Sequence, residues 1–529
     1  MHGIKRTLCC VLVVIALTDG YLTAGVRLDS CFTDNMVLQR DVPARISGTT
    51  DEGSEITVEF SGQKKTVKAV GANGAPSTQG SSVAAGWRVT LDPMKACSEP
   101  QVMIITSSIG NQKSEIKNIL VGDVWICSGQ SNMRQAVMKG PGCNYGGALN
   151  ASNEVAAADY PGIRLYQNSG ATNWEACTPE TVKRFSATGY FYALELHRRL
   201  KVPIGMAEGS MGGTDAESWA PREALFDAAE IEAAEKVYLE LKTVADEDRK
   251  ASGMWKRDYD KAKKEGKPLP PQPKAKMSRE DGKRCGEAAR IHYAGNNYSG
   301  FIAKYTPMAI KGVIWYQGES NCSRANQYAA LMTRLIAFWR KDWGSDFPFM
   351  IMQLVNFGKG HGNPQSGFAD LREAQQKIAD TVPNTGLAVG IDIGEPNNIH
   401  PGNKQEVGRR LALVALKKAY GQDVVAGGPV LKSAEFTDGK AVLSFDPGGK
   451  DQKLVLKNSA TNGFELAGTD GKFVPAVAGV NESTITLTAQ GVSEPSLVRY
   501  AWYDDPPVSL FNSDGLPAAP FRRIKESVK

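Results

Sequence analysis

The sequence predicts an α/β protein with a mainly parallel central sheet and β-rich regions at both ends. Two observations predict this class. Between about residues 119 and 424, short apolar runs alternate with helical patterns, which is typical of parallel strands covered by helices on both faces. Residues 26–118 and 425–529 contain mostly short strands and turns instead.

Composition limits the classes of function. The chain has 529 residues, of which 42% are hydrophobic and 22% charged. This suits a large buried core in about three domains, and it excludes a disordered chain, a fibrous repeat and a polytopic membrane protein. The 62 basic and 57 acidic residues nearly balance, and no block of like charge indicates nucleic-acid binding.

Residues 1–25 have the pattern of a signal peptide. Lys5 and Arg6 precede an apolar run at residues 8–17, which is too short to span a bilayer and suits an h-region. Small residues at 20 and 23–25 offer cleavage sites. The alternative is an ordinary buried N-terminal segment. We therefore expect a secreted or periplasmic protein without a membrane span.

Cysteine usage gives a weaker signal. Cys9 and Cys10 fall in the expected signal peptide, and no C-x-x-C pair follows, so the sequence does not indicate a structural zinc site. The remaining cysteines are odd in number, which leaves at least one unpaired. One or two disulfides stay open, with no pairing readable from the sequence.

Three regions follow the expected signal peptide, the second with an insertion. Residues 26–118 predict a β-sandwich-like domain, because segments such as 56–60 alternate apolar and polar side chains. Residues 119–424 form the α/β part. Strands are expected at 119–121, 124–126, 312–316, 347–355 and 387–391, and helices at 190–200, 327–343, 371–378 and 404–420. A charged helical insertion interrupts it at about 223–290, either as a solvated face or as a partner-binding surface. Residues 425–529 return to short strands, which form one split domain with the first region or a separate one.

Ser131 is the candidate nucleophile. It follows the buried strand 124–127 and lies beside Gly129, at the carboxyl edge of the sheet where α/β proteins place reactive groups. A helix that starts there would supply backbone N–H donors. On the local pattern alone, a helix N-cap serine is the alternative.

A serine nucleophile needs a general base, normally histidine. After residue 25 the chain has His197, His292, His361 and His400. Position favours His400, which stands on a loop before the helix 404–420, and His361 in a glycine-rich loop comes second. Oxyanion donors are expected at strand ends, where Gln317 and the glycines at 212–213 stand.

Together these segments resemble the sialate O-acetylesterase family of SGNH (GDSL-like) hydrolases. The stretch 122–133 is similar to the family's nucleophile block, 313–321 to its third block, and 399–411 to its histidine block. Residues 35–40 and 499–518 resemble the family's N-terminal and C-terminal regions. The resemblance implies an SGNH-hydrolase-like three-layer α/β/α core, and it is weakest over the charged stretch 223–290.

The resemblance also implies residue roles. Ser131 would be the nucleophile, His400 the general base, and the Ser131 N–H, the Gly212 N–H and the Gln317 side chain the oxyanion donors. One position departs from the usual SGNH pattern, since Asn397 stands where an aspartate often precedes the histidine. Asp392 or Glu395 would replace that acid, or a Ser-His dyad would operate.

The resulting expectation is a secreted serine esterase that removes O-acetyl groups from sialic acids or sialoglycans through an acetyl-enzyme intermediate. Alternatives are an esterase for other acetylated carbohydrates, such as xylan or pectin fragments, and a non-catalytic carbohydrate-binding protein. Because sialate carries a carboxylate, Arg134 and Arg324 are candidate substrate-binding residues. The chemistry requires no metal and no organic cofactor.

Overall fold

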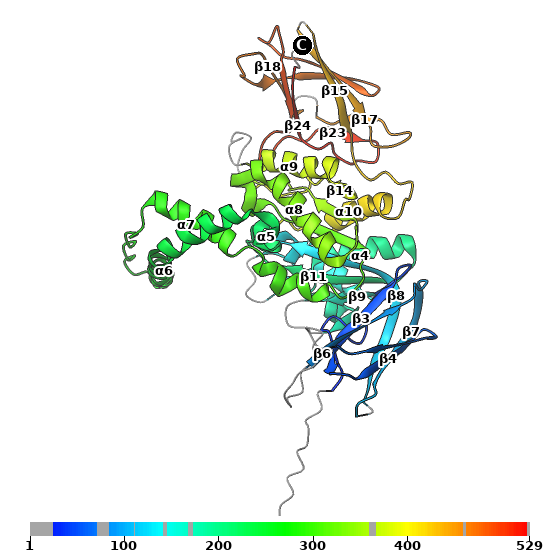
Figure 1. Ribbon diagram of the computed structural model, residues 1–529. Helices are drawn as coiled ribbons and strands as arrows, with labels where there is room; N and C mark the ends of the chain where they lie inside the picture. Colours follow the sequence, from blue (N-terminus) through cyan, green and yellow to red (C-terminus); the bar gives the residue numbers. More distant parts are fainter. Residues whose placement is uncertain are drawn as a thin grey trace, which may run out of the picture.

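A computed structural model describes residues 25–70, 84–110, 112–140, 145–167, 173–358, 367–437, 439–458 and 462–525. Three parts are stacked along the long axis of the molecule in Figure 1, with the N-terminal β region at one end, the α/β part in the middle and the C-terminal β region at the other end. The expected signal peptide and His361 lie outside the described residues.

The N-terminal region consists of strands, as the alternating pattern predicted. Its strands are β1 (Arg27–Leu28), β2 (Val37–Gln39), β3 (Ala44–Asp51), β4 (Glu55–Phe60), β5 (Gln63–Lys68), β6 (Ala84–Leu91), β7 (Cys97–Ser107) and β8 (Lys113–Gly129). The start of β8 pairs antiparallel with β7. Its second half is buried on both faces and pairs in parallel with two strands of the central sheet. Thus β8 crosses the predicted boundary at residues 118–119 without a break.

The central sheet has the order β10-β9-β11-β8-β12-β13-β14. All neighbours in this order are parallel except β10 and β9, so the predicted α/β class with a mainly parallel sheet is confirmed. The strands are β9 (Tyr160–Tyr166), β10 (Trp174–Cys177), β11 (Ile204–Ser210), β12 (Gly312–Tyr316), β13 (Phe349–Met352) and β14 (Thr385–Ala388).

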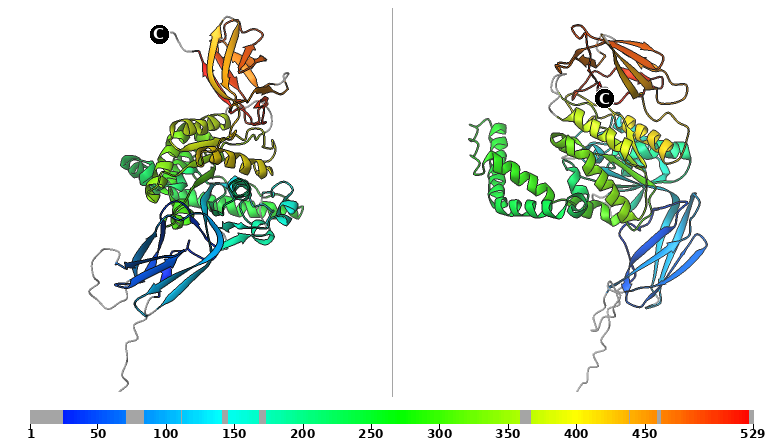
Figure 2. Two further views of the ribbon diagram at one scale, coloured as in Figure 1. Left: turned by 90° about the vertical axis from the view of Figure 1, so that its right-hand side faces the viewer. Right: turned by 45° about the horizontal axis from the view of Figure 1, so that its top comes forward.

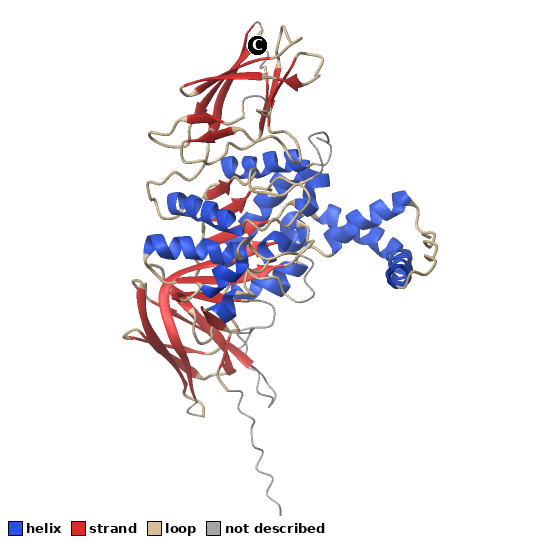
Figure 3. Cartoon of the chain, turned by 180° about the vertical axis from the view of Figure 1, so that it is seen from behind, coloured by secondary structure: helices blue, strands red, loops and turns tan. Residues whose placement is uncertain are grey.

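Helices pack against this sheet in two groups, α4 with α10 and α8 with α9. In Figure 3 the blue helices of the middle part lie around its red strands. The α-helices of this part are α1 (Ser131–Arg134), α2 (Ala151–Ala156), α3 (Pro179–Val182), α4 (Ala187–Leu200), α5 (Arg222–Leu225), α8 (Ala325–Trp343), α9 (Phe368–Thr381) and α10 (Lys404–Lys418). Shorter helical turns are η1 (Ala216–Trp219), η2 (Tyr298–Ile302), η3 (Ala303–Tyr305) and η4 (Glu319–Arg324).

Two helices within the predicted charged insertion, α6 (Ala228–Lys264) and α7 (Arg279–His292), project away from the rest of the molecule (Figure 2). They pack on each other around a small apolar cluster that contains Tyr238 and Cys285. Most other side chains of α6 are polar and solvent-accessible, in agreement with a solvated charged surface.

The C-terminal region is antiparallel and has its own hydrophobic core. Its strands are β15 (Val430–Thr437), β16 (Lys440–Asp446), β17 (Leu454–Leu456), β18 (Phe464–Ala467), β19 (Val474–Pro475), β20 (Val477–Asn481), β21 (Thr484–Thr488), β22 (Leu497–Tyr500), β23 (Leu510–Asn512) and β24 (Phe521–Ile524). The N-terminal region, in contrast, shares one apolar core with the central sheet.

The six cysteines within the described residues, Cys31, Cys97, Cys127, Cys177, Cys285 and Cys322, are free thiols. No helix among the described residues is long and apolar enough to cross a bilayer.

Candidate active site

Ser131 is the first residue of α1 and lies at the carboxyl edge of the central sheet, as predicted. The turn before it depends on Gly129, whose φ is 137° and where an added Cβ would come within 2.1 Å of the Tyr316 carbonyl oxygen. This close approach lets the Gln130 N–H donate to that carbonyl at 3.0 Å. The end of β8 is thereby joined tightly to the end of β12, and Ser131 itself is 7% exposed.

Helix α1 is short but well anchored. The Ser186 hydroxyl donates to the Met133 carbonyl at 2.6 Å, and the Thr188 hydroxyl donates to the Asn132 carbonyl at 3.3 Å. Both donors come from the start of α4. These bonds satisfy carbonyl groups that a helix of one turn leaves open, so main chain and buried side chains together hold the Ser131 turn.

Gly212 lies next to Ser131. The Met211 N–H donates to the Gly129 carbonyl at 3.1 Å, which brings the end of β11 to the end of β8. A Cβ on Gly212 would lie 3.5 Å from the Ser131 Cβ and 3.0 Å from the Tyr145 hydroxyl oxygen. The structure therefore brings together these two residues, which the sequence placed about eighty positions apart.

Gln317 follows β12 and is fully buried. Its amide nitrogen donates to the Asn321 side-chain oxygen at 2.7 Å and to the Thr214 carbonyl at 3.1 Å, and its oxygen accepts from the Tyr328 hydroxyl at 2.9 Å. Both amide hydrogens are thus already used in this arrangement. Its role as an oxyanion donor stays a prediction, and that role requires one of these bonds to be exchanged for the substrate.

His400 stands on the loop between β14 and α10, as predicted. Its ring lies against the Tyr145 ring, with 4.5 Å between the centroids. The Asn132 amide, one residue after Ser131, donates to the Ile399 carbonyl, one residue before His400, at 2.9 Å. Residues adjacent to the predicted nucleophile and the predicted base are therefore directly bonded to each other.

The other two described histidines are engaged elsewhere. The His197 Nδ1 atom lies 2.8 Å from the Val202 carbonyl oxygen at the end of α4. His292 is stacked on Tyr238 in the helical insertion and lies 2.7 Å from Glu235. Neither contacts the Ser131 turn in any of these interactions.

The carboxylates considered for a triad do not bind the His400 ring in the described residues. Asp392 forms a two-pronged ion pair with Arg410, with N–O distances of 2.5 and 2.9 Å. Glu395 accepts hydrogen bonds from the Gly402 N–H at 2.9 Å and from the Asn398 amide at 3.0 Å. In the described residues Asp392 is paired with Arg410 and no contact joins it to the imidazole, so its expected role in orienting His400 stays a prediction.

Burial shifts the pKa of several groups in the site. Burial, and then the nearby Lys404, lower the pKa of His400. Burial lowers the pKa of Lys404 to about 7. Burial raises the pKa of Glu319, and this effect outweighs the hydrogen bond that Asn132 donates to the carboxylate at 2.6 Å, which lowers that pKa. A histidine with a lowered pKa is neutral at physiological pH, as a general base has to be.

The two predicted substrate arginines line different cavities. Arg134 donates to the Ser210 carbonyl at 3.0 Å and borders a cavity of about 430 Å³ that Tyr145 also lines. Arg324 borders a cavity of about 460 Å³ beside the helical insertion and is paired with Glu217 at 2.8 Å. Only Arg134 is therefore placed next to residues that also contact the Ser131 and His400 turns.

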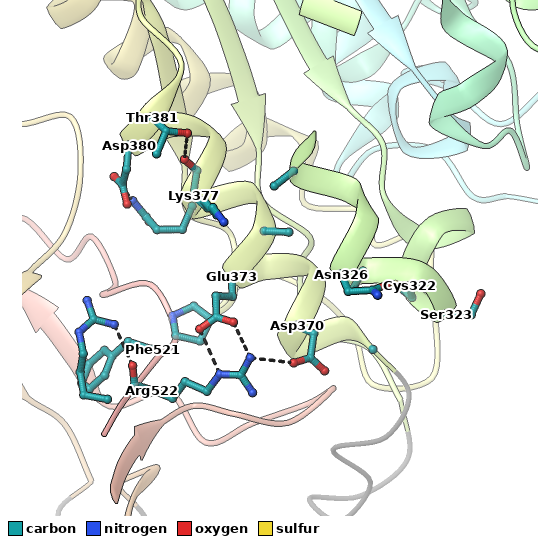
Figure 4. A pocket seen from close by; sticks show the side chains of 17 residues that line it. Cys322, Ser323, Asn326, Asp370, Glu373, Lys377, Asp380, Thr381, Phe521 and Arg522 are labelled. Carbon is teal, nitrogen blue, oxygen red and sulfur yellow. Dashed lines mark hydrogen bonds and ion pairs between the residues drawn. The ribbon is translucent and has the colours of Figure 1, made fainter. Parts of the chain in front are cut away.

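A larger cavity, of about 730 Å³, lies between α8, α9 and β24 (Figure 4). Arg522 reaches across it to Asp370 and Glu373. None of the predicted site residues is among the described residues that line it. In the same described part of the chain, no group of three or more His, Cys, Asp or Glu side chains is arranged to hold a metal ion.

Sequence reasoning gave no role to four residues that the structure places around Ser131 and His400. Asn132, Glu319 and Lys404 lie inside the three sequence blocks that resemble the family, at the starts of α1, η4 and α10, and that position is the signal that marks them. Tyr145 has no such signal, since it stands in a glycine-rich stretch far from either block.

Comparisons with known proteins indicate a carbohydrate esterase. The family described as "Carbohydrate esterase, sialic acid-specific acetylesterase" matches residues 288–417. The chain is 28% identical to the sialate O-acetylesterase of Rattus norvegicus over 97% of its length and 96% of the relative's. For the sialate O-acetylesterase of Homo sapiens the identity is 27%, over 97% and 95%.

A solved structure agrees as well. The crystal structure of a novel carbohydrate acetylesterase from Xanthomonas citri has 31% sequence identity and a TM-score of 0.75, and the match covers 94% of this chain and 99% of that one. Fold and similarity together define a carbohydrate esterase of the α/β type. The chain belongs to the sialate O-acetylesterase family.

Proposed function

We propose that this carbohydrate acetylesterase hydrolyses O-acetyl esters of sialic acids, with Ser131 as nucleophile and His400 as general base. The observation that carries the catalytic assignment is the hydrogen bond from Asn132 to the Ile399 carbonyl, which ties the residues next to Ser131 and His400 together. The position of Ser131 at the start of α1, at the carboxyl edge of the sheet, supports the same assignment.

The proposed reaction has two steps. The Ser131 hydroxyl oxygen attacks the acetyl carbonyl carbon while its proton passes to the His400 imidazole. The C–O bond to the sugar then breaks, and the sugar oxygen leaves with that proton, which leaves acetyl-Ser131. Water, deprotonated by His400, next attacks the acetyl carbonyl carbon. The bond from that carbon to the Ser131 oxygen breaks, the proton passes from His400 to Ser131, and acetic acid leaves and ionises to acetate. The backbone N–H groups of Ser131 and Gly212 would stabilise the oxyanion in both steps.

The sialate preference is the finer part of the proposal. It is supported by the full-length similarity to sialate O-acetylesterases and by Arg134 at the cavity that Tyr145 lines. A guanidinium there could pair with the sialate carboxylate. The second candidate substrate is another acetylated carbohydrate, such as a xylan or pectin fragment, which the similarity to the carbohydrate acetylesterase from Xanthomonas citri favours.

A substrate panel tests the proposal. Wild-type enzyme is assayed for acetate release from O-acetylated sialic acids, acetylated xylo-oligomers and acetylated pectin fragments, with the Ser131→Ala variant as control. The expected result is that acetylated sialic acid has the highest kcat/KM and that Ser131→Ala releases no acetate above background from any of them. Faster turnover of the neutral sugars would assign the enzyme to the second candidate substrate.

We also propose that the protein is secreted or periplasmic, on the evidence of the charged and apolar pattern in residues 1–25. Expression of the full chain should give a processed protein whose new N-terminus, read by mass spectrometry, lies near residue 20 or 25. An unprocessed N-terminus in the purified protein would contradict this proposal.

A further inference from the structure

The backbone around His400 is bonded on both sides. The Ile399 carbonyl accepts from the Asn132 amide at 2.9 Å, and the Pro401 carbonyl accepts from the Lys404 amine at 2.8 Å. The two donors are also bonded to each other, since the Lys404 amine donates to the Asn132 side-chain oxygen at 2.9 Å. The backbone of residues 399–401, which carries His400, is thus held by a set of three linked hydrogen bonds, which we call the Lys404–Asn132 clamp.

Glu319 fixes the orientation of Asn132 in this clamp. The Asn132 nitrogen donates one hydrogen to Ile399 and the other to the Glu319 carboxylate at 2.6 Å, while its oxygen faces the Lys404 amine. Rotation of the amide by half a turn would place its oxygen against two acceptors and its nitrogen against a donor. Asn132 is fully buried, so no solvent is available to compensate such a rotation.

Lys404 is an unusual residue for a purely structural position. Its side chain is fully buried, with the amine 5.7 Å from the centroid of the Tyr316 ring. Burying an amine costs free energy that an apolar side chain of the same length would not cost. Burial lowers its pKa to about 7, which is the expected sign of this cost.

We infer that Lys404 and Asn132 are positioning residues for catalysis, because their clamp holds the His400 loop against the Ser131 turn. This inference rests on the proposed roles of Ser131 and His400. Through the loop backbone, the clamp supplies part of the positioning that a carboxylate provides in a Ser-His-Asp triad. In this chain Asp392 is paired with Arg410, and Glu395 binds the loop backbone and Asn398.

The first test is Lys404→Met, which keeps the length of the side chain and removes its donor. We expect kcat for p-nitrophenyl acetate to fall about 10²-fold, the size of effect that a small displacement of a catalytic group produces, with KM changed less than about twofold. Lys417→Met is the matched control, because Lys417 is an exposed lysine in the last turn of the same helix. It should keep wild-type kcat.

Asn132→Ala breaks the clamp from the nucleophile side. If both side chains act on one loop, the double variant Lys404→Met/Asn132→Ala should lose no more kcat than the more impaired single variant. Circular dichroism and Tm are measured for each variant. If Lys404→Met does not fold, Asn132→Ala alone tests the clamp, and the same loss in kcat is expected.

A pH profile separates positioning from general damage. The charged and titratable groups around His400 and Lys404 are Tyr145 against the imidazole, Glu395 on the same loop, Glu319 at the start of η4, and Tyr316 on β12. Since Lys404 lowers the pKa of His400, its removal should move the acid limb of kcat/KM to higher pH. Damage to the fold alone would lower the profile without moving this limb.

The outcomes distinguish the clamp from the function it serves. If Lys404→Met keeps more than half of the wild-type kcat while Ser131→Ala is inactive, the clamp is disproved and the esterase mechanism stands. Additive losses in the double variant together with an unmoved acid limb would also disprove it. If Ser131→Ala or His400→Ala stays active, the proposed catalytic pair is wrong and the clamp falls with it.

Discussion

Ser131 and His400 are held by different kinds of structure. Ser131 follows the 17-residue strand β8 almost directly, and the main-chain bonds of Gln130 and Met211 fix the end of that strand to its neighbours. His400 stands on a loop between β14 and α10, where side chains of Asn132, Asn398, Glu395 and Lys404 hold the backbone. The nucleophile therefore owes its position mainly to the sheet, with the Ser186 and Thr188 hydroxyls anchoring α1, whereas the base owes its position to a few polar side chains.

This difference has a consequence for substitutions. Sheet main-chain bonds persist when one side chain is changed, so changes on the Ser131 side should alter chemistry and leave the fold intact. Side-chain bonds are lost with the side chain that makes them, so changes on the His400 side should disturb position as well. Substitutions on the two sides therefore test this contrast.

Ser131→Ala should reduce kcat for p-nitrophenyl acetate by about 10⁴–10⁶-fold, the usual cost of removing an acyl-transfer nucleophile. Far-UV circular dichroism and Tm should stay close to wild type, because the Gln130 and Met211 main-chain bonds do not involve the serine side chain. A variant with more than a tenth of the wild-type rate would mean that Ser131 is not the nucleophile.

Gln317→Ala should lower kcat by about 10²–10³-fold with little change in KM, if its amide acts in the transition state. In the structure this amide is bonded to Asn321 and Thr214. Steady-state kinetics with p-nitrophenyl acetate measure the two constants separately. An effect on KM alone would make Gln317 a substrate-binding residue, and an effect on Tm alone would make it part of the scaffold.

Asp392→Asn and Glu395→Gln test the carboxylates near the base. We expect Asp392→Asn to lower the free energy of unfolding by about 2 kcal/mol, because the largely buried Arg410 loses a charged partner, and to leave kcat within about tenfold of wild type. Glu395→Gln keeps an oxygen for the Gly402 N–H and should have a similarly small effect on kcat.

Urea unfolding and steady-state kinetics give the two quantities for both variants. If either variant loses about 10⁴-fold in kcat, that residue is the orienting acid of a triad. If both stay near wild type while His400→Ala is inactive, the enzyme works with a Ser-His dyad.

Arg134→Ala should raise KM for acetylated sialic acid severalfold and leave p-nitrophenyl acetate turnover almost unchanged, since that ester has no carboxylate. Arg324→Ala is the matched comparison, because Arg324 is already paired with Glu217 and borders a different cavity. It should leave both KM values near wild type. Equal loss on both esters for Arg134→Ala would indicate damage to the catalytic turn instead.

The wild-type pH profile carries the smallest expected effect. Burial and Lys404 lower the pKa of His400, so the neutral, active base should persist to pH values below 6.5, the ordinary histidine value. The acid limb of kcat/KM, measured over pH 4–8, should therefore lie below 6.5. The same shift means that stability falls as the pH falls through this range, because the unfolded chain binds the proton first. An acid limb above 7 would contradict the assignment of His400.

Much of the fold was predictable from local patterns. The run Gly312–Tyr316 is a strand with those bounds, and the helices predicted at 327–343 and 404–420 agree with α8 and α10 to within a few residues. These elements were predictable because their apolar periodicity reflects burial directly. By contrast, 119–121 and 124–126 were expected as separate runs but form one strand, since Gly122 and Asp123 continue the pairing of β8.

The amino-acid sequence alone was enough to predict the α/β class, the strand ends that precede Ser131 and Gln317, and the family resemblance of the blocks around them. These features depend on residue type and spacing within short segments. The contacts between those segments became known from the folded chain: Asp392 with Arg410, Arg324 with Glu217, and Asn132 with Ile399 and Lys404. Such pairings join residues up to 272 positions apart. The physical reason is that a side chain's partner is set by how strands and loops converge at one edge of the sheet, which no local pattern encodes.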